Sequence, residues 1–294
     1  MIGIDWGTSS LRAFRIARNG TVIESRSSAR GIMTITDRRF EPVLRAEIGD
    51  WLAAGETRIL LCGMIGSRQG WREARYVPCP AGIDELAAQL IPVAFDGAKV
   101  MIVPGIATED AEGVPEVMRG EETQILGAAS QERMVLCLPG THSKWARVAG
   151  GRIDGFTTYM TGEIFGALSE HTILAHTMRR APTDDAAFDE GLVRAKAAGG
   201  LLHHAFGVRT LVLRGGMSEA AAFSYLSGLL IGHELASVFD NDVVDNGKVR
   251  VIGAGALTAL YARAIGAWGG EAVMIGEAAT AAGLAMLGDF AEWE

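Results

Sequence analysis

The chain has 294 residues, of which 49 % are hydrophobic and 21 % charged, so it can form a sizeable folded core. With a formal net charge of −8 it lacks the basic surface expected of a nucleic-acid-binding protein. Its 38 glycines are nearly twice the usual share of about 7 %, but with only 8 prolines they do not indicate low-complexity disorder.

The cysteine pattern and hydropathy predict the compartment. Three cysteines without a CxxC pair argue against a disulfide scaffold. The N-terminus lacks the basic and apolar regions of a signal peptide. The longest uncharged stretch, 220–233, is shorter than the ~20 residues that cross a bilayer. We therefore expect a cytoplasmic protein without nucleic-acid or membrane partners.

The first segment predicts a strand, a turn and a hairpin. Met1–Asp5 is apolar, as a short buried strand would be, and it leads into the turn Asp5-Trp6-Gly7-Thr8-Ser9. Residues 11–17 alternate apolar and polar side chains, Asn19-Gly20 is typical of a tight hairpin turn, and residues 21–25 alternate again.

The same order of elements recurs in the middle of the chain. Residues 134–138 form a second apolar strand, followed by the turn Gly140-Thr141-His142-Ser143. Residues 144–149, the turn Gly150-Gly151 and residues 152–156 predict a second hairpin. Two halves that open in the same way predict a duplicated architecture. Two unrelated hairpins are the alternative.

Apolar periodicity predicts the remaining elements. Helices are expected at 121–131, 162–178, 188–206, 218–239, 257–268 and 277–287, and further strands at 58–62, 100–103, 210–214 and 249–253. Strands interleaved with helices indicate an α/β protein. The glycine-containing stretch 118–120 is the expected crossover between two lobes.

The turn after the first strand is a candidate phosphate site. Backbone N–H groups of a glycine turn can bind phosphate oxygens, and the hydroxyls of Thr8 and Ser9 can add hydrogen bonds. Asp5 can hold a hydrated Mg²⁺ ion. The alternative is a turn in which Asp5 only caps its own hairpin.

The second turn offers a matching site. Lys144 follows it and can place a positive charge beside a transferred phosphoryl group. The alternatives are a solvated Lys144 and a His142 side chain that only satisfies its own turn. Two such turns, one in each lobe, can face each other across a cleft and bind a triphosphate.

Two other glycine junctions allow more than one interpretation. Residues 251–257 run from a strand through Gly253 and Gly255 into a helix. A Rossmann fingerprint needs a small residue where Thr258 stands, and only about 40 residues follow, so a surface for adenine or ribose fits better.

Glu121 and Glu122 follow Gly120 at the start of a predicted helix, where acidic residues complement the helix dipole. A carboxylate there can also accept a proton from an attacking hydroxyl.

The polar segment 63–71 follows an apolar strand and contains several glycines. Arg68 in this segment is suited to bind a carboxylate with two hydrogen bonds. A surface loop with a solvated arginine is the alternative.

In combination, these segments resemble the actin/sugar-kinase/Hsp70 ATPase superfamily and, more narrowly, the 2-dehydro-3-deoxygalactonokinases. The motifs that carry the likeness are GIDWGTSSLRAF, CGMIGSRQGW with YVPCPAG, RGEETQILG, LPGTHSKW, YMTGE and LRGGMSEAAAFSYLSGLLIG. The resemblance implies two similar lobes of the actin-like ATPase (ribonuclease H-like) type around a nucleotide cleft. It places the N-terminal lobe at 1–118 and the C-terminal lobe at 119–276, with the C-terminal helix 277–294 packing back on the first lobe.

The resemblance also implies a reaction and its residues. ATP, with Mg²⁺, phosphorylates 2-dehydro-3-deoxy-D-galactonate at its 6-hydroxyl in galactonate degradation. Glu121 is the implied general base with Glu122 as the alternative, while Asp5 orients Mg²⁺ and Lys144 neutralises charge. The expected nucleotide-binding residues are Gly7, Thr8, Ser9, Gly140, Thr141, His142, Ser143, Gly215, Gly216, Gly253 and Gly255. The expected substrate-binding residues are Gly63, Met64, Ser67, Arg68, Gln69 and Trp71.

Three other functions share part of this pattern. An actin- or Hsp70-like ATPase would have both phosphate turns but no sugar substrate, and a kinase for the gluconate epimer would have all the motifs. A dinucleotide oxidoreductase would account only for Gly253 and Gly255. The oligomeric state is open, with a homodimer among the options.

Overall fold

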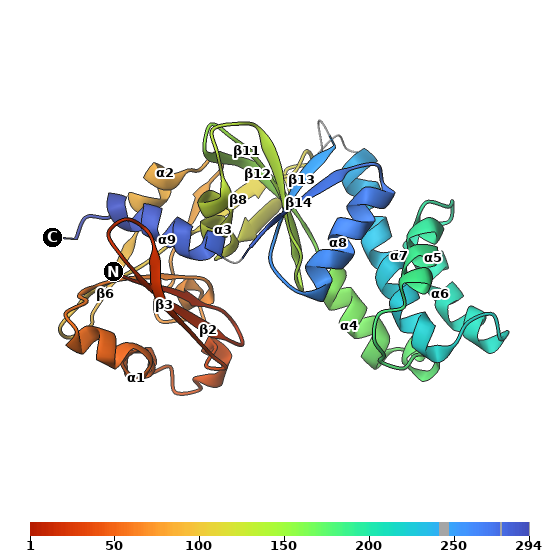
Figure 1. Ribbon diagram of the computed structural model, residues 1–294, viewed down its shortest axis with the longest axis horizontal. Coiled ribbons are helices and arrows are strands. Elements are labelled where there is room, and N and C mark those ends of the chain that lie inside the picture. The colour runs from red at the N-terminus through yellow and green to blue at the C-terminus, as the bar shows by residue number, and fades with distance from the viewer. Residues whose placement is uncertain (241–246, 277, 294) are drawn as a thin grey trace. The chain divides into compact units, whose positions relative to one another are not determined.

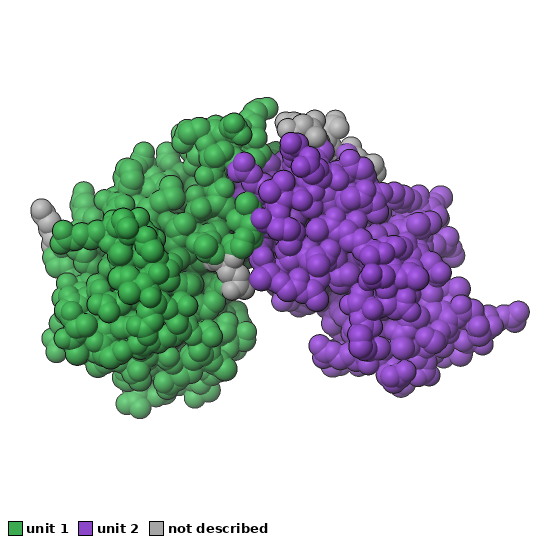
Figure 2. Space-filling model, viewed as in Figure 1, with its two compact units in different colours: residues 1–134, 146–157, 275–294 green, residues 135–145, 158–274 purple. Residues whose placement is uncertain are grey.

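The computed structural model describes residues 1–240, 247–276 and 278–293, and the chain forms two compact units, coloured separately in Figure 2. Unit 1 comprises residues 1–134, 146–157 and 275–294, and unit 2 comprises residues 135–145 and 158–274. These bounds differ from the expected division after residue 118, because residues 119–134 and 146–157 group with unit 1. Residues 277 and 294, the ends of the expected C-terminal helix, lie outside the described residues.

Unit 1 is built on a mixed sheet with the strand order β3-β2-β1-β4-β7-β6 (Figure 1). The first hairpins are antiparallel, whereas β4 pairs parallel to β1 and β7 parallel to β4. The strands are β1 (Ile2–Trp6), β2 (Leu11–Ile16), β3 (Val22–Ser28), β4 (Arg58–Cys62), β6 (Ile91–Val93) and β7 (Lys99–Ile102). A smaller sheet has the order β5-β8-β9, with bounds Tyr76–Pro78, Gly105–Glu109 and Pro115–Met118.

Side chains alternate along each strand, so the mixed sheet that contains β1 has two covered faces. Ile2 and Ile4 are fully buried and share a core with apolar side chains of α1 (Phe40–Ala53). Gly3 points the other way, where a Cβ would lie 2.9 Å from the Leu284 side chain of α9 (Ala278–Phe290). The short helix α2 (Ile83–Ala87) packs near α9. Side chains of β1 therefore alternate between the α1 core and the face on which α9 packs.

The helices α3 (Glu121–Ala128) and α9 pack backbone against backbone. A Cβ on Gly127 would lie 2.0 Å from the carbonyl oxygen of Ala279. A Cβ on Gly283 would lie 1.9 Å from the carbonyl oxygen of Thr123. These glycines let the two helices approach more closely than side chains would allow, which fixes the start of α3 in unit 1.

A second sheet repeats the strand order of the first. Its order β12-β11-β10-β13-β14 matches β3-β2-β1-β4-β7, and β10 pairs parallel to β13 as β1 does to β4. The predicted duplication is confirmed. The strands are β10 (Met134–Leu138), β11 (Ser143–Ala149), β12 (Arg152–Tyr159), β13 (Lys248–Ile252) and β14 (Glu271–Ile275).

Unit 2 adds a group of helices (Figure 1). They are α4 (Thr161–His171), α5 (Asp185–Ala195), α6 (Gly200–Leu213), α7 (Glu219–Asp240) and α8 (Ala256–Ala267). A Cβ on Gly228 of α7 would lie 2.0 Å from the carbonyl oxygen of Phe188 in α5, so these two helices are in close contact. The length and hydropathy of α7 would let it cross a membrane, but most of it is buried inside unit 2, as in the core helix of a soluble protein.

Three sequence predictions of local structure were wrong. The run 210–214 is not a strand: residues 210–213 form the last turn of α6, whose buried side chains are His204 and Val208, and Arg214 follows the helix. The helix expected at 188–206 is divided into α5 and α6, and Gly199 and Gly200 at the start of α6 adopt positive φ. The helix expected at 162–178 ends at His171 and continues as a 3-10 segment, Ile173–Thr177.

Candidate active site

Asp5 lies near the end of β1, just before the first predicted phosphate turn. Its Oδ2 accepts a hydrogen bond from Nη2 of Arg12 at 2.6 Å, and its side chain is only 13 % exposed. Asp5 thus pairs with the neighbouring strand. In the turn, the N–H of Gly7 donates to the carbonyl of Ser10 at 2.9 Å, and Thr8 and Ser9 are exposed. Both hydroxyls are therefore accessible to a ligand.

Two other predicted segments meet Asp5 within unit 1. A Cβ on Gly63 would lie 2.8 Å from the carbonyl oxygen of Trp6 and 3.1 Å from Oδ1 of Asp5. Gly120 has a φ of +106°, and a Cβ there would lie 3.0 Å from the Cα of Gly63. These close contacts exclude larger side chains at both glycines. The structure therefore brings together the end of β1, the start of the substrate segment and the start of α3.

The two glutamates at the start of α3 have different environments. Glu122 is fully buried, and its carboxylate accepts hydrogen bonds from the N–H of Gly120 at 2.6 Å and the hydroxyl of Thr123 at 2.9 Å. Burial, with the charge of Glu121 nearby, raises the pKa of Glu122 to about 8. Glu121 is half-buried, and its Oε2 accepts from the N–H of Arg119 at 3.1 Å. Of the two, Glu121 is the carboxylate that a hydroxyl group can reach.

The raised pKa of Glu122 predicts a pH-dependent stability. Because the folded protein holds this proton more tightly than the unfolded chain, the free energy of unfolding should fall as pH rises from about 4.5 to about 8. In Glu122→Gln this contribution disappears. Urea unfolding of both proteins across this pH range measures the slopes. Identical slopes would show that Glu122 does not bind the proton.

The predicted substrate segment is partly buried and partly exposed. Ser67 is 9 % exposed, and its hydroxyl donates to the carbonyl of Met64 at 2.7 Å. The Trp71 ring is half-buried and stacks on Phe40 with centroids 6.5 Å apart. Arg68 is 83 % exposed and forms an ion pair with Glu73 at 3.0 Å, and Gln69 is also exposed. The structure therefore places the side chain of Arg68 at the surface.

Sequence reasoning missed Arg119, which is 8 % exposed. Its Nη2 donates to the carbonyl of Ala74 at 2.8 Å, and its guanidinium lies 4.4 Å from the centroid of the Tyr76 ring. Its Nε and Nη1 have no hydrogen-bond partner within the described part of the chain. A Cβ on Gly66 would lie 3.0 Å from Nη1. The sequence shows an arginine before Gly120, but nothing in the pattern indicates that its side chain is buried with no carboxylate partner among the described residues.

The second predicted turn lies against the start of α4 in unit 2. A Cβ on Gly162 would lie 2.5 Å from the carbonyl oxygen of Gly140, and the N–H of Glu163 donates to the carbonyl of Thr141 at 3.0 Å. Nε2 of His142 and Oε2 of Glu163 are 2.5 Å apart. Lys144 is only 5 % exposed, so the alternative of a solvated lysine is wrong.

A cavity of about 680 Å³ adjoins this turn within unit 2. Its lining includes Gly140 and Thr141 of the turn, Thr161 and Gly162 of α4, and Leu257 and Tyr261 of α8. Gly253 and Gly255 lie in the β13–α8 junction that leads to this wall. Gly215 and Gly216 follow the end of α6, where Gly215 has a φ of +74°, and neither lines the cavity.

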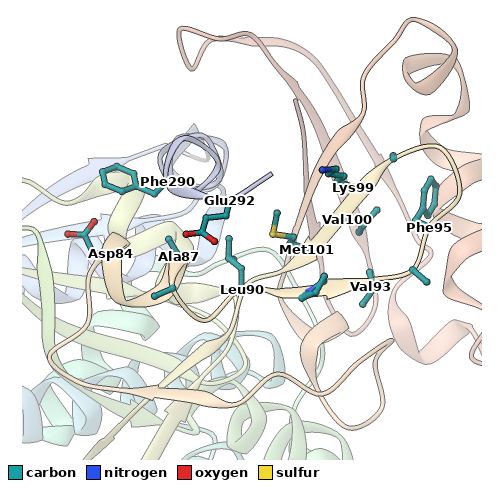
Figure 3. Close-up of a pocket in the computed structure, with 14 residues that line it drawn as sticks. Asp84, Ala87, Leu90, Val93, Phe95, Lys99, Val100, Met101, Phe290 and Glu292 are labelled. Carbon is teal, nitrogen blue, oxygen red and sulfur yellow. The ribbon is translucent and has the colours of Figure 1, made fainter. Parts of the chain in front are cut away.

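A cavity of about 740 Å³ in unit 1 is shown in Figure 3. Its lining comes from α2, β6, β7 and the segment after α9, with Asp84, Phe95, Lys99 and Glu292 among the side chains drawn. None of the predicted site residues lines it. The two phosphate turns therefore lie elsewhere.

The three cysteines are free thiols without the character of nucleophiles. Burial raises the pKa values of Cys62 and Cys137 well above the usual thiol value. Partial burial raises the pKa of Cys79 to about 11. Cys62 and Cys137 are fully buried in the core.

Three known proteins are similar to this chain in sequence or in structure. The chain is 39 % identical over 269 residues to a protein of Rhizobium meliloti named a probable 2-dehydro-3-deoxygalactonokinase, covering 89 % of this chain and 87 % of that protein. The crystal structure of a Sinorhizobium meliloti protein, to which the same activity is ascribed, matches with a TM-score of 0.90, 37 % identity and 97 % coverage of both chains. The activator of 2-hydroxyisocaproyl-CoA dehydratase from Clostridium difficile, with bound ADPNP, matches with a TM-score of 0.52 at 13 % identity, covering 99 % of this chain and 94 % of that one.

Together, the repeated sheets and these likenesses define a phosphotransferase with the actin-like ATPase and sugar-kinase fold, so the predicted fold class is confirmed. The chain belongs to the 2-keto-3-deoxy-galactonokinase family, whose model matches residues 5–287.

Proposed function

We propose that the protein transfers the γ-phosphoryl group of ATP to the 6-hydroxyl of 2-dehydro-3-deoxy-D-galactonate, in galactonate degradation. The observation that carries this proposal is family membership over residues 5–287, and a glycine-containing turn after the first strand of each sheet supports it. Phosphoryl transfer requires mainly positioning and charge stabilisation, which fits a site built from glycine turns, carboxylates and buried cations.

The nucleotide is assigned to the cavity of unit 2 and the turn that adjoins it. The cavity has an apolar lining with a few polar groups, as expected of a site for a nucleoside. The N–H groups of Gly140–Ser143 bind phosphate oxygens, and the Gly253–Gly255 junction lies against the base or ribose. Lys144 neutralises charge at this turn. Gly7–Ser9 are the proposed phosphate-binding residues of unit 1. Gly215 and Gly216 remain predicted contacts at the end of α6.

Asp5 is assigned to Mg²⁺. Within the described ranges, no group of three or more His, Cys, Asp or Glu side chains forms a metal site. This fits a magnesium ion that one or two carboxylates hold together with the substrate's phosphates. Bound in this way, Mg²⁺ offsets phosphate charge during transfer. The ion pair with Arg12 keeps the Asp5 carboxylate oriented at the end of β1.

The sugar acid is assigned to the segment 63–71 and the start of α3. Glu121 accepts the proton of the attacking hydroxyl, because it is the more accessible of the two glutamates. The carboxylate of the keto acid requires a positive charge. Arg119 carries a buried charge without a carboxylate partner in the described structure, whereas Arg68 is exposed and paired with Glu73. We assign the main electrostatic attraction to Arg119, with Ser67 and the exposed Arg68 as further contacts.

A coupled assay of ADP release distinguishes the candidate functions. With ATP, Mg²⁺ and the keto acid, the proposed kinase releases ADP only when the keto acid is present. ADP release without it would favour an actin- or Hsp70-like ATPase, and equal kcat/KM for the gluconate epimer would overturn the proposed substrate. Phosphorus NMR of the product identifies the hydroxyl that is phosphorylated. We also propose a cytoplasmic location. Mass photometry tests whether the protein is a monomer or a homodimer.

A further inference from the structure

Glu234 of α7 is a buried carboxylate to which the proposed mechanism gives no role. It is 3 % exposed. Its Oε1 accepts a hydrogen bond from the hydroxyl of Ser143 at 2.8 Å and from Nε1 of Trp145 at 2.7 Å. Its Oε2 accepts from the hydroxyl of Tyr261 at 2.7 Å and from the hydroxyl of Thr161. Four donors saturate the acceptor sites of one ionised carboxylate.

The four donors come from different places in the chain. Ser143 closes the second phosphate turn and Trp145 continues β11, whereas Thr161 begins α4 and Tyr261 lies on α8. Thr161 and Tyr261 line the cavity of about 680 Å³, as do Gly140 and Thr141 of the turn. One side chain therefore connects the turn with two helices that form the cavity wall.

We propose that Glu234 is a positioning residue, whose carboxylate sets the spacing of the phosphate turn, α4 and α8 around the nucleotide. This inference rests on the proposed function, because it takes the cavity to be the nucleotide site. A buried charge normally costs stability unless it is fully hydrogen-bonded. Here the four hydrogen bonds offset that cost, and they make the positions of their donors depend on one another.

The energetic cost of burying this charge affects the pKa of Glu234. Burial raises the pKa of Glu234, although all four hydrogen bonds act to lower it. A neutral side chain of the same shape would remove the charge but offer only one acceptor atom to four donors. The Glu234→Gln variant therefore weakens several contacts at once with little change in volume.

The test compares nucleotide and keto-acid parameters in full-length variants. For Glu234→Gln we expect the KM for ATP and the Kd for ADP, measured by calorimetry, to rise about 10-fold or more, because each hydrogen bond was charge-assisted. The KM for the keto acid should be unchanged. Trp145→Phe is the matched control, because it removes one hydrogen bond to the same carboxylate at a residue that does not line the cavity. Its effect on ATP should be smaller than that of Glu234→Gln.

Tyr261→Phe serves as a second variant if Glu234→Gln fails to fold. It removes one donor and leaves the carboxylate in place, so we expect a rise of several-fold in the KM for ATP alone. An unchanged Kd for ADP, or equal rises in both KM values, would overturn the positioning role. The wild-type protein separates this result from the proposed function. If it binds ADP more tightly than the variant but transfers nothing to the keto acid, only the proposed substrate fails.

Discussion

Glu121→Gln is expected to lower kcat by about 10²–10⁴-fold while ATP still binds, because general-base catalysis contributes a factor of this size. The Glu121 side chain is half-buried at the start of α3, one residue from Gly120, whose position approaches Gly63 and the end of β1. Gln has nearly the same shape but accepts no proton. Steady-state kinetics with ADP calorimetry measures both effects.

Glu122→Gln is the matched comparison. Its side chain is fully buried and already accepts two hydrogen bonds, so we expect its effect to appear mainly in stability. A loss of kcat larger than that of Glu121→Gln would move the proton-accepting role to Glu122. Near-normal turnover in both variants would exclude the start of α3 as the source of the base.

The fold was predictable where local pattern and tertiary role agree. Residues 58–62 and 134–138 match β4 and β10 to the residue, because both are short and mostly apolar and each ends before a turn residue, Gly63 or Pro139. The recurring turn and hairpin also predicted the duplication, which the matching strand order of the two sheets confirms. The run 210–214 misled because its apolar residues are compatible with either a strand or the end of a helix, and packing decided for α6.

The candidate site was predictable as segments but not as contacts. Asp5, Gly63 and Gly120 are far apart in the sequence, and only the close approach of Gly63 to the Asp5 side chain and to Gly120 shows that they lie together in unit 1. The two arginines also differ in burial, which the sequence does not show. Arg68 stands in a conspicuous motif but is exposed, whereas Arg119 is buried. Periodicity does not reveal that two nitrogens of the Arg119 guanidinium group are buried without a hydrogen-bond partner in the described structure.

Arg119→Met is expected to raise the KM for the keto acid about 10- to 100-fold without lowering the thermal stability. Hydrogen bonds and attractions to a charged group are worth about 1.5–3 kcal/mol, which corresponds to this loss of affinity. At the same time, Nε and Nη1 are buried without partners in the described structure, so the folded protein carries a desolvation cost for this charge. An apolar side chain of similar length removes that cost, which offsets the lost contacts with Ala74 and Tyr76.

Arg68→Met is the matched control, because it makes the same change at an exposed residue. Its ion pair with Glu73 lies at the surface, where such pairs contribute about 0–1 kcal/mol, so the KM for the keto acid and the Tm should both change little. Arg119→Lys keeps the charge and should retain part of the affinity. Differential scanning fluorimetry with keto-acid kinetics gives both quantities. If Arg119→Met unfolds at a lower temperature and binds the keto acid normally, Arg119 supports the fold through Ala74 and Tyr76, and the substrate carboxylate finds its positive charge elsewhere.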